Sequence, residues 1–491
     1  MTLEEKNPTR NRISAFVIAL SGYYIGYCLP IFNSMATPMF CGYFGLTVEE
    51  KDSIQGTLNF LFCFAAMFGV LSLAYFNDTF GRLRTSMGLD FCMILVAILF
   101  QVNNIYTIEI ARLLNGFLTG MYNMSARLTL VEMMPRKLSS DANLWICVIS
   151  GVMSLVSFLQ QLFISQAWLS AHWSFVLAWP TAISVLRLIY FNYAFDSDTP
   201  VYIYQQHKNC PDLHSKLHES FSMIYKDTNL DQHIETYIAE KSKTELKSLG
   251  LLAANKELFT EKYYDRTVGA ILLKVFESFT GFPFLIFFST SFFEKMGMNG
   301  KFISFLLGIF YIVGSLIGVA TINKFKRIDL MLGGLAIQSM AFLFMYFFVI
   351  LNIQFMVPVF VTLFMMAYMA GIGGVNSMYI AELLPAQAIG ITMALGWIIW
   401  AFVGKLSIGI VGIFGETNTL LFYGLACAII CWVLKKYLVE PNTEVLAKET
   451  TSPLIPLVDL RLSYENTRKS IDKWTQEYRS SVISKTSQLS K

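Results

Sequence analysis

The chain has 491 residues, of which 55% are hydrophobic and only 14% are charged. So few charges leave too little polar surface for a water-soluble protein of this length, and a formal net charge of +3 argues against nucleic acid as a partner. About a dozen apolar stretches reach the roughly 20 residues that a membrane-spanning helix needs. None alternates with the period of two that a transmembrane barrel requires. We therefore expect an all-α membrane protein embedded in a lipid bilayer.

The apolar stretches predict twelve transmembrane helices, six on each side of one polar segment. In chain order they are 13–32, 54–76, 85–102, 106–133, 143–164, 173–195, 267–293, 302–322, 330–351, 355–384, 389–414 and 420–439. The corresponding domains are an N-terminal bundle (1–195), a linker with short helices (196–266), a C-terminal bundle (267–439) and a polar tail (440–491). Two pseudo-symmetric six-helix bundles are typical of transporters, whose site lies between them near the bilayer midplane.

Basic residues are distributed unevenly between the short loops. The even-numbered loops contain Arg82, Arg84, Arg136, Lys137, Lys324, Lys326 and Arg327, whereas the odd-numbered loops contain only Lys51, Lys295 and Lys301. The positive-inside rule then predicts both termini and the linker on the cytoplasmic or matrix side. No N-glycosylation sequon lies in a predicted odd-numbered loop. This favours the membrane of an organelle, such as the mitochondrial inner membrane, over the plasma membrane.

Matching motifs recur in the two halves of the chain. Glu-x-x-Pro ends the fourth helix at Glu132 and the tenth at Glu382. The loop after the second helix reads Asn-Asp-Thr-Phe-Gly-Arg-Leu-Arg at 77–84, and the loop after the eighth reads Asn-Lys-Phe-Lys-Arg at 323–327. Two copies at equivalent places indicate an internal repeat.

With these motifs the chain resembles the sugar porter family of the major facilitator superfamily over residues 13–443. Arg112, Gly116 and Gly120 match its R-x-x-x-G-x-x-x-G, and 288–297 (FSTSFFEKMG) is close to its Y-S-T-S-I-F-E-K-A-G. The resemblance implies the major facilitator fold and transport of a small organic solute by alternating access, with no enzymatic chemistry, cofactor or metal. It also implies a set of gating and structural residues. These are Asp78, Gly81, Arg82, Arg112, Glu132, Asp198, Lys324, Arg327 and Glu382.

The positions where this family binds sugar carry other residues here. The sequence replaces the helix 5 glutamine with Trp145, the helix 8 asparagine with Tyr311, and the Q-Q-L-S-G-x-N of helix 7 with ESFTGFP at 277–283. The candidate substrate-binding residues are Trp145, Glu277, Ser278, Tyr311, Asn376, Trp397 and Trp400. A pocket that loses its hydroxyl-binding partners loses its polyhydroxylated ligand. We therefore predict a solute that is less hydroxylated than a hexose, or one that is positively charged.

Residues of coupling and gating in this family are replaced as well. Cys28 stands where proton-coupled members hold an aspartate, which excludes proton symport through that position. Ser139 and Ile389 replace the arginines that follow the two Glu-x-x-Pro motifs, so Glu132 and Glu382 have each lost a likely partner.

Charge inside a membrane helix is costly and usually functional, and six ionisable residues within the predicted helices are candidates on this ground. They are Asp90, Arg127, Arg187, Lys274, Glu277 and Lys405. We expect Arg187 and Lys274 to extend toward a membrane interface. Glu277 either faces a cavity or pairs with Lys274, one helical turn earlier. Gly116 and Gly120, four residues apart, predict a close approach between their helix and a neighbour.

Two other functions remain open beside transport. Because sugar ligands and gate arginines are replaced, the chain could be a transport-inactive structural subunit of a larger membrane complex. A nutrient sensor is the third possibility. The 440–491 tail places Ile471, Trp474 and Tyr478 on one helical stripe that would suit a membrane surface or a protein partner. His214 and His218, four apart, have no further ligand nearby in the sequence, so we expect no metal site there.

Overall fold

The protein was analysed as a computed structural model that describes residues 4–245, 264–322, 324–383 and 386–438. In this part of the chain the structure is helical, with one isolated bridge between Glu5 and Tyr225. The first half contains α1 (Pro8–Ala19), α2 (Gly22–Cys28), α3 (Ile31–Ala36), the π-helical η1 (Thr37–Tyr43), α4 (Val48–Phe80), α5 (Arg82–Leu99), α6 (Ile105–Met133), α7 (Arg136–Phe163), α8 (Gln166–Ala171), α9 (Trp173–Ala178) and α10 (Thr181–Ala194).

The middle of the chain contains α11 (Pro200–His207), α12 (Leu213–Ser222) and α13 (Leu230–Glu245). The second half contains α15 (Tyr264–Ser278), α16 (Phe282–Lys295), α17 (Gly300–Thr321), α18 (Arg327–Ile350), the 3-10 turn η2 (Gln354–Met356), α19 (Val357–Ala370), α20 (Ile372–Leu383) and α21 (Ala386–Tyr437). The predicted tail at 440–491, with its amphipathic stripe, lies outside the described residues.

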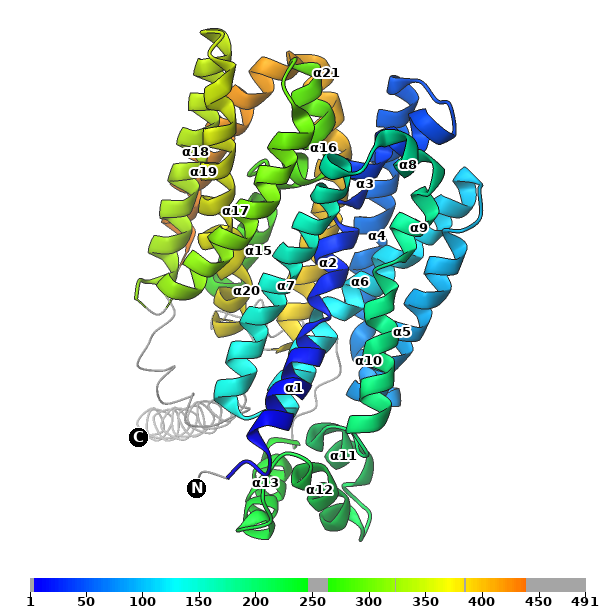
Figure 1. The fold of residues 1–491 in the computed structure, drawn as a ribbon. Helices are drawn as coiled ribbons and strands as arrows, with labels where there is room; N and C mark the ends of the chain where they lie inside the picture. Colours follow the sequence, from blue (N-terminus) through cyan, green and yellow to red (C-terminus); the bar gives the residue numbers. More distant parts are fainter. Residues whose placement is uncertain (1–3, 246–263, 323, 384–385, 439–491) are drawn as a thin grey trace, which may run out of the picture.

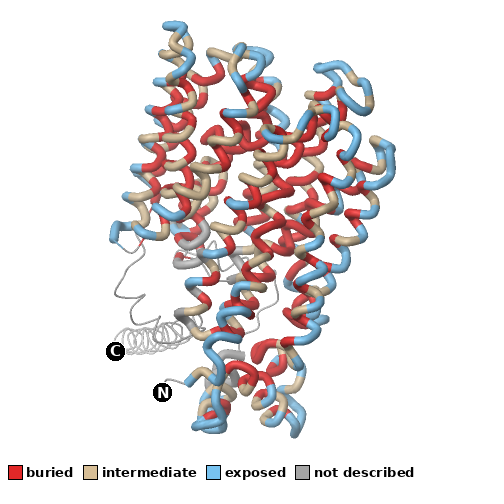
Figure 2. The backbone as a smooth tube through the Cα atoms, viewed as in Figure 1, coloured by how far each residue is buried: buried red, intermediate tan, exposed pale blue. Residues whose placement is uncertain are grey.

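The helices form two groups that stand side by side, α1–α10 in one and α15–α21 in the other (Figure 1). The most extensive contacts between the groups are those of α4 with α21, α7 with α17, and α3 with α16. Buried residues lie mostly on helix faces that are turned toward other helices, and exposed residues gather on the outer faces and at the helix ends (Figure 2). Large apolar side chains such as Tyr193 and Ile413 are 91% and 79% exposed on those outer faces, as expected for a surface that contacts lipid.

Nine helical segments of the described chain are long and apolar enough to cross a membrane. Two further predicted spans correspond to α5 and α6, which carry ionisable residues on inward-facing positions. The remaining span belongs to α21, whose 52 residues bend at Gly415 (φ 75°, ψ 165°). At about 1.5 Å per residue, a helix of this length is more than twice the thickness of a bilayer core of about 30 Å. Together these helices account for the twelve predicted spans.

Several spans are broken rather than continuous, which the sequence analysis did not predict. Gly281 separates α15 from α16 within the predicted helix 267–293, and its φ of +84° suits glycine. A Cβ at Gly281 would also lie 2.7 Å from the Phe342 ring. Irregular backbone is tolerated at membrane depth where it is buried in protein. The broken helix therefore places Glu277 and Ser278 at the end of α15, inside the second bundle.

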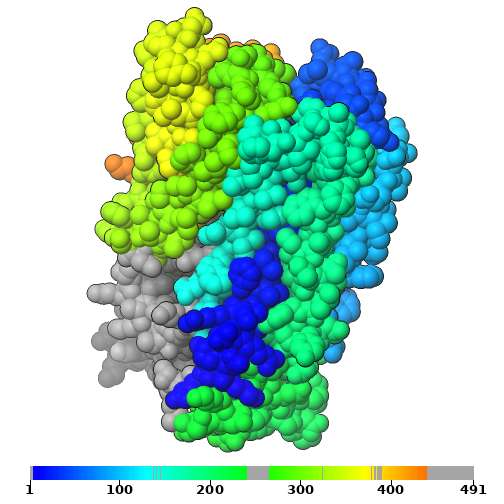
Figure 3. Space-filling model, viewed as in Figure 1, coloured from blue at the N-terminus to red at the C-terminus, as the bar shows by residue number. Residues whose placement is uncertain are grey.

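The short helices α11–α13 pack against the base of the first group, where α1 also begins (Figure 3). Their apolar contacts centre on Leu217 and Ile234, both 0% exposed. The chain before α1 is tied to them, since the Lys6 backbone N–H donates to the Ile224 carbonyl at 2.9 Å. Burial raises the pKa of Tyr225 to about 12. The residue bounds of the linker and of the two bundles stay a prediction.

Candidate functional site

Four polar side chains of the second bundle meet at Glu277, near the break between α15 and α16. Lys274 Nζ lies 2.9 Å from one carboxylate oxygen of Glu277. The Tyr368 hydroxyl donates to the other oxygen at 3.1 Å, and the Asn376 side-chain amide donates to the carboxylate as well. Glu277 is only 6% exposed. Of the two roles considered for Glu277, the structure shows the pair with Lys274, extended by partners from α19 and α20.

Aromatic rings flank this polar cluster. The Phe282 ring stacks on Tyr368 with centroids 4.0 Å apart and planes 7° from parallel. Trp400 of α21 lies 5.5 Å from Phe282 and 5.8 Å from Trp397. Trp397 in turn contacts Phe62 of α4 at 6.1 Å, across the boundary between the two groups of helices. Glu277, Asn376 and the two tryptophans are thus brought into one region.

The other candidate ligands lie differently. Tyr311 of α17 reaches the first bundle, with its hydroxyl 3.4 Å from that of Ser150 on α7. The Ser278 hydroxyl donates to the Lys274 carbonyl of its own helix at 3.1 Å and so does not bind a neighbouring helix. Trp145 is 40% exposed and packs edge-on against Phe16 of α1. The structure does not bring Trp145 to the Glu277 cluster.

A second buried charge pair lies inside the first bundle. Arg187 Nε is 3.4 Å from Asp90 Oδ2, and the two side chains are 1% and 0% exposed. Tyr122 donates a hydrogen bond to Asp90, and its ring lies 5.1 Å from the Arg187 guanidinium. The expectation that Arg187 and Lys274 extend to a membrane interface is therefore wrong for both, because each finds a carboxylate inside its bundle.

Arg112 is held in the first bundle without a carboxylate. Its guanidinium donates to the Cys28 carbonyl at 2.6 Å and to Asn59 Oδ1 at 3.3 Å. The rings of Phe62 and Phe32 lie 4.0 and 4.7 Å from the guanidinium carbon. Aromatic faces attract a cation but do not neutralise it.

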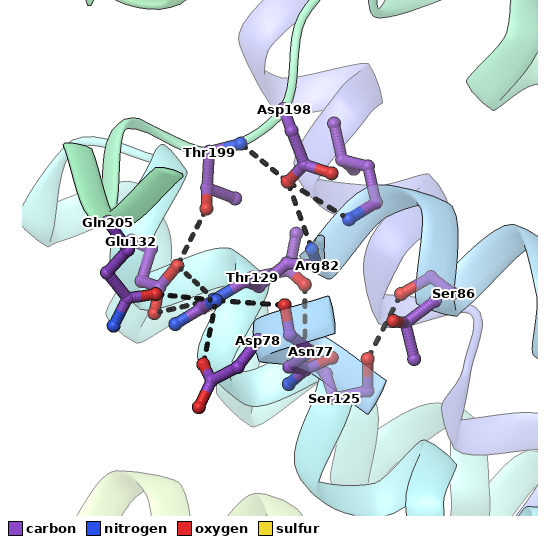
Figure 4. A network of polar contacts seen from close by, with 12 residues as sticks. Asn77, Asp78, Arg82, Ser86, Ser125, Thr129, Glu132, Asp198, Thr199 and Gln205 are labelled. Atoms are coloured by element: carbon purple, nitrogen blue, oxygen red, sulfur yellow. Dashed lines mark hydrogen bonds and ion pairs between the residues drawn. The ribbon is translucent and has the colours of Figure 1, made fainter. Parts of the chain in front are cut away.

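At the base of the first bundle, a polar network joins the α4–α5 loop to α6 and α11 (Figure 4). Arg82 Nε lies 3.0 Å from Glu132 Oε2, and its Nη1 lies 3.3 Å from Asp78 and 3.2 Å from Gln205. Thr199 also donates to Glu132 at 2.8 Å. Glu132 has lost the arginine expected at position 139, but it pairs with Arg82 instead. Burial, followed by the negative charge of Glu132, raises the pKa of Tyr237 nearby.

Asp198 closes the same network by capping α5. Its Oδ1 accepts hydrogen bonds from the backbone N–H groups of Arg82 at 3.0 Å and Leu83 at 3.3 Å, at the first turn of that helix. Gly81, with φ +96°, leaves room for this carboxylate, since a Cβ there would lie 2.2 Å from Asp198 Oδ2. A carboxylate at a helix N-terminus satisfies free N–H groups and interacts favourably with the helix dipole.

Replacing Asp198 with alanine is expected to lower the free energy of unfolding by about 0.5–2 kcal/mol, because the α5 N–H groups lose their acceptor. The readouts are the thermal unfolding midpoint in detergent and the rate of proteolysis in the α4–α5 loop. Asp196→Ala is the matched control, since that side chain is exposed two residues earlier. Equal proteolysis of the two variants would show that the cap does not hold the loop.

Lys324, Arg327 and Glu382 are the gating candidates of the second half, and the structure describes them only in part. Lys324 is exposed, and the Arg327 guanidinium donates to the Ile322 carbonyl. Glu382 lies in α20, and its side chain is outside the described part of the structure. A role for these three residues in gating stays a prediction.

Polar side chains join the two halves at the end far from α11–α13. The Asn33 amide donates to Ser289 Oγ at 2.8 Å, and Gln55 donates to the Phe287 carbonyl at 2.6 Å. Gln161 donates to Thr290 at 3.1 Å. The remaining contacts are Lys51 with Ser291 at 3.0 Å and Lys295 with Asp52 at 2.7 Å. We call this set the polar seal.

The sequence analysis missed the polar seal. The sequence feature that could have predicted it is the presence of side-chain amides inside or beside apolar segments, at Asn33, Gln55 and Gln161. Such amides bond between helices because lipid offers them no partner.

The histidine pair on α12 lies at the surface. His214 and His218 are 3.8 and 4.0 Å from Asp231 Oδ1, and all three side chains are largely exposed. Among the described residues, no group of three or more potential ligands has an arrangement that could hold a metal ion.

Comparisons with known proteins agree with this arrangement of helices. A family described as "Sugar (and other) transporter" matches residues 14–446. Plastidic glucose transporter 4 of Arabidopsis thaliana is 22% identical over 84% of this chain and 73% of its own length. Hexose transporter 1 of Plasmodium vivax is 21% identical over 66% of this chain and 67% of its own.

Among solved structures, the partially occluded inward open xylose transporter XylE from E. coli has a TM-score of 0.69. It is 13% identical, and the match covers 87% of this chain and all of that one. A crystal structure of a D-xylose-proton symporter has a TM-score of 0.66 at 16% identity over 88% of this chain and 98% of its own. The fold is that of the major facilitator superfamily. The chain therefore belongs to the sugar transporter family and is a multi-pass membrane transporter rather than an enzyme.

Proposed function

We propose that this protein carries a small organic solute by alternating access and that its solute is less hydroxylated than a hexose. The observation behind the proposal is the Glu277 cluster. Lys274, Tyr368 and Asn376 already satisfy the Glu277 carboxylate, so few groups there are free to bind sugar hydroxyls. Phe282, Trp397 and Trp400 add apolar faces beside it. A site with few free polar groups disfavours a polyhydroxylated ligand.

This geometry does not support a positively charged solute. The carboxylate of Glu277 was the reason for considering one, but Lys274 lies 2.9 Å from that carboxylate, so the pair carries no net charge. We also propose that both termini and α11–α13 face the cytoplasm or matrix, on the basis of the basic even-numbered loops.

Replacing Trp400 with alanine is expected to raise the half-saturating solute concentration roughly tenfold, because the solute loses one aromatic face, a change of about 1.4 kcal/mol. The measurement is uptake of a labelled metabolite panel by purified protein in liposomes. Trp432→Ala is the matched control, since this tryptophan also belongs to α21 but is 73% exposed on the outer surface. Solutes with fewer hydroxyls should be carried faster than glucose or xylose.

Two results would contradict the proposal. Glucose uptake at the rate of the best solute, unchanged by Trp400→Ala, would indicate an ordinary sugar site elsewhere. If no solute moves and the protein purifies only within a larger complex, it is a transport-inactive subunit. In that case, removing the tail after Glu444 should release it from the complex.

A further inference from the structure

Six ionisable side chains inside the membrane helices fall into two groups. Asp90 with Arg187 and Glu277 with Lys274 form two pairs, at 3.4 and 2.9 Å, that are each neutral overall. Two arginines of α6, Arg112 and Arg127, have no carboxylate within 4 Å among the described side chains. The described interior therefore carries positive charge without a counter-charge.

Arg112 is the more deeply buried of the two arginines, at 1% exposed. Its partners are the neutral Cys28 carbonyl and Asn59 amide oxygen, and its Nε has no hydrogen-bond acceptor. A buried guanidinium stays protonated, because arginine cannot lose its proton in proteins. Its field thus reaches the surrounding low-dielectric interior with little compensation.

Arg127 lies near the place where the two halves of the molecule touch. Its Nη2 is 3.8 Å from Cys147 Sγ on α7, and Cys147 lies about one helical turn before Ser150 on the same helix. The Tyr311 hydroxyl lies 3.4 Å from that of Ser150, where the two halves touch. About one turn earlier on α6, Met124 packs against a small cluster formed by Val70 of α4 with Met393 and Ala394 of α21. Arg127 is half-buried, so part of its side chain is still accessible.

In alternating access the solute passes between the two halves, so a cation at that boundary meets it directly. A guanidinium offers a planar fork of donors that fits carboxylate and phosphate oxygens. We propose that the transported solute is an anion whose carboxylate or phosphate group binds Arg127. Arg112, about 22 Å further along α6 at 1.5 Å per residue, adds to the positive field that attracts it. This inference rests on the proposed transport function.

The test is uptake into liposomes of solutes that share a carbon skeleton and differ in charge: glycerol, glycerate and glycerol phosphate, then glucose, gluconate and glucose 6-phosphate. The inference expects at least one anionic member to be carried at least tenfold faster than its neutral parent. Comparing glycerate with glycerol phosphate tells whether carboxylate or phosphate is preferred. Arg127→Gln should reduce anion uptake at least tenfold, and Arg127→Lys should retain part of it.

Arg84→Gln is the control, because it removes an exposed arginine of the first turn of α5 and should leave uptake unchanged. Size-exclusion profiles show whether each variant is folded. If Arg127→Gln is unfolded, the folded Arg127→Lys variant decides, and anion uptake by it equal to that of the wild type at every concentration overturns the inference. If the neutral parents are carried as fast as the anions, the inference fails while transport stands. If no solute of the set or of the metabolite panel is carried, the proposed function fails and the inference fails with it.

Discussion

Replacing Asp90 with alanine is expected to lower the free energy of unfolding by about 3–5 kcal/mol, among the largest effects of any single substitution in this protein. The reason is Arg187, which is 1% exposed and would remain buried and charged when its carboxylate partner is removed. The rings of Tyr122 and Phe191, each 5.1 Å from the guanidinium, compensate only part of that loss. The thermal unfolding midpoint in detergent measures the effect.

Two controls separate charge from packing in this prediction. Replacing both Asp90 and Arg187 with leucine removes the pair together and should recover most of the lost stability, because no buried charge remains. Glu4→Ala breaks the exposed pair with Lys226 and should change the midpoint little. An Asp90→Ala variant as stable as the wild type would show that Arg187 does not depend on that carboxylate.

Replacing Gly116 with alanine is the second substitution for which we expect a large loss, about 1–3 kcal/mol of unfolding free energy. A Cβ at Gly116 would lie 2.1 Å from the Phe62 carbonyl oxygen, and one at Gly120 would lie 2.1 Å from that of Ala66. Both contacts are with the backbone of α4, so relief requires α6 to move away from α4. The fraction of protein that remains monodisperse on heating measures the loss.

Gly88 of α5 provides the matched control, because a Cβ there meets nothing within 4 Å. Gly88→Ala should be neutral or stabilise the protein by about 0.4–1 kcal/mol, through lower entropy of the unfolded chain. Equal effects of the two alanine substitutions would mean that helix propensity, and not the close approach of α4 and α6, governs both positions.

The spans and the close approach at Gly116 were predictable because they depend on local pattern. Apolar length predicts a membrane helix wherever it occurs, and glycines four residues apart present one bare face. The two Glu-x-x-Pro copies likewise indicated two related halves. These signals lie within a few turns of one helix, or recur at matched places in the chain.

The pairing of buried charges was not predictable in the same way. Asp90 and Arg187 are nearly a hundred residues apart, and only the packing of α5 against α10 brings them together. Lys274 and Glu277 lie one turn apart, so their pairing could be considered from the sequence. Tyr368 and Asn376 complete that cluster from α19 and α20, helices whose position depends on the tertiary fold. Trp145 was a candidate ligand only because of its position in the family pattern, and the structure does not bring it to this cluster.

The polar seal makes the two faces of this carrier kinetically unequal. The Asn33, Gln55 and Gln161 amides must each exchange a protein partner for water before their end opens, at a net cost of about 0.5–1.5 kcal/mol for each bond. In the alternating-access cycle proposed above, we therefore expect the empty carrier to rest with that end shut, so that only a small fraction of molecules presents a site there. A solute arriving from that face has its apparent affinity reduced by the same fraction. Half-saturation then requires a higher solute concentration on the sealed side than on the other side. The difference in apparent affinity between the two sides is thus set by the conformational equilibrium of the empty protein.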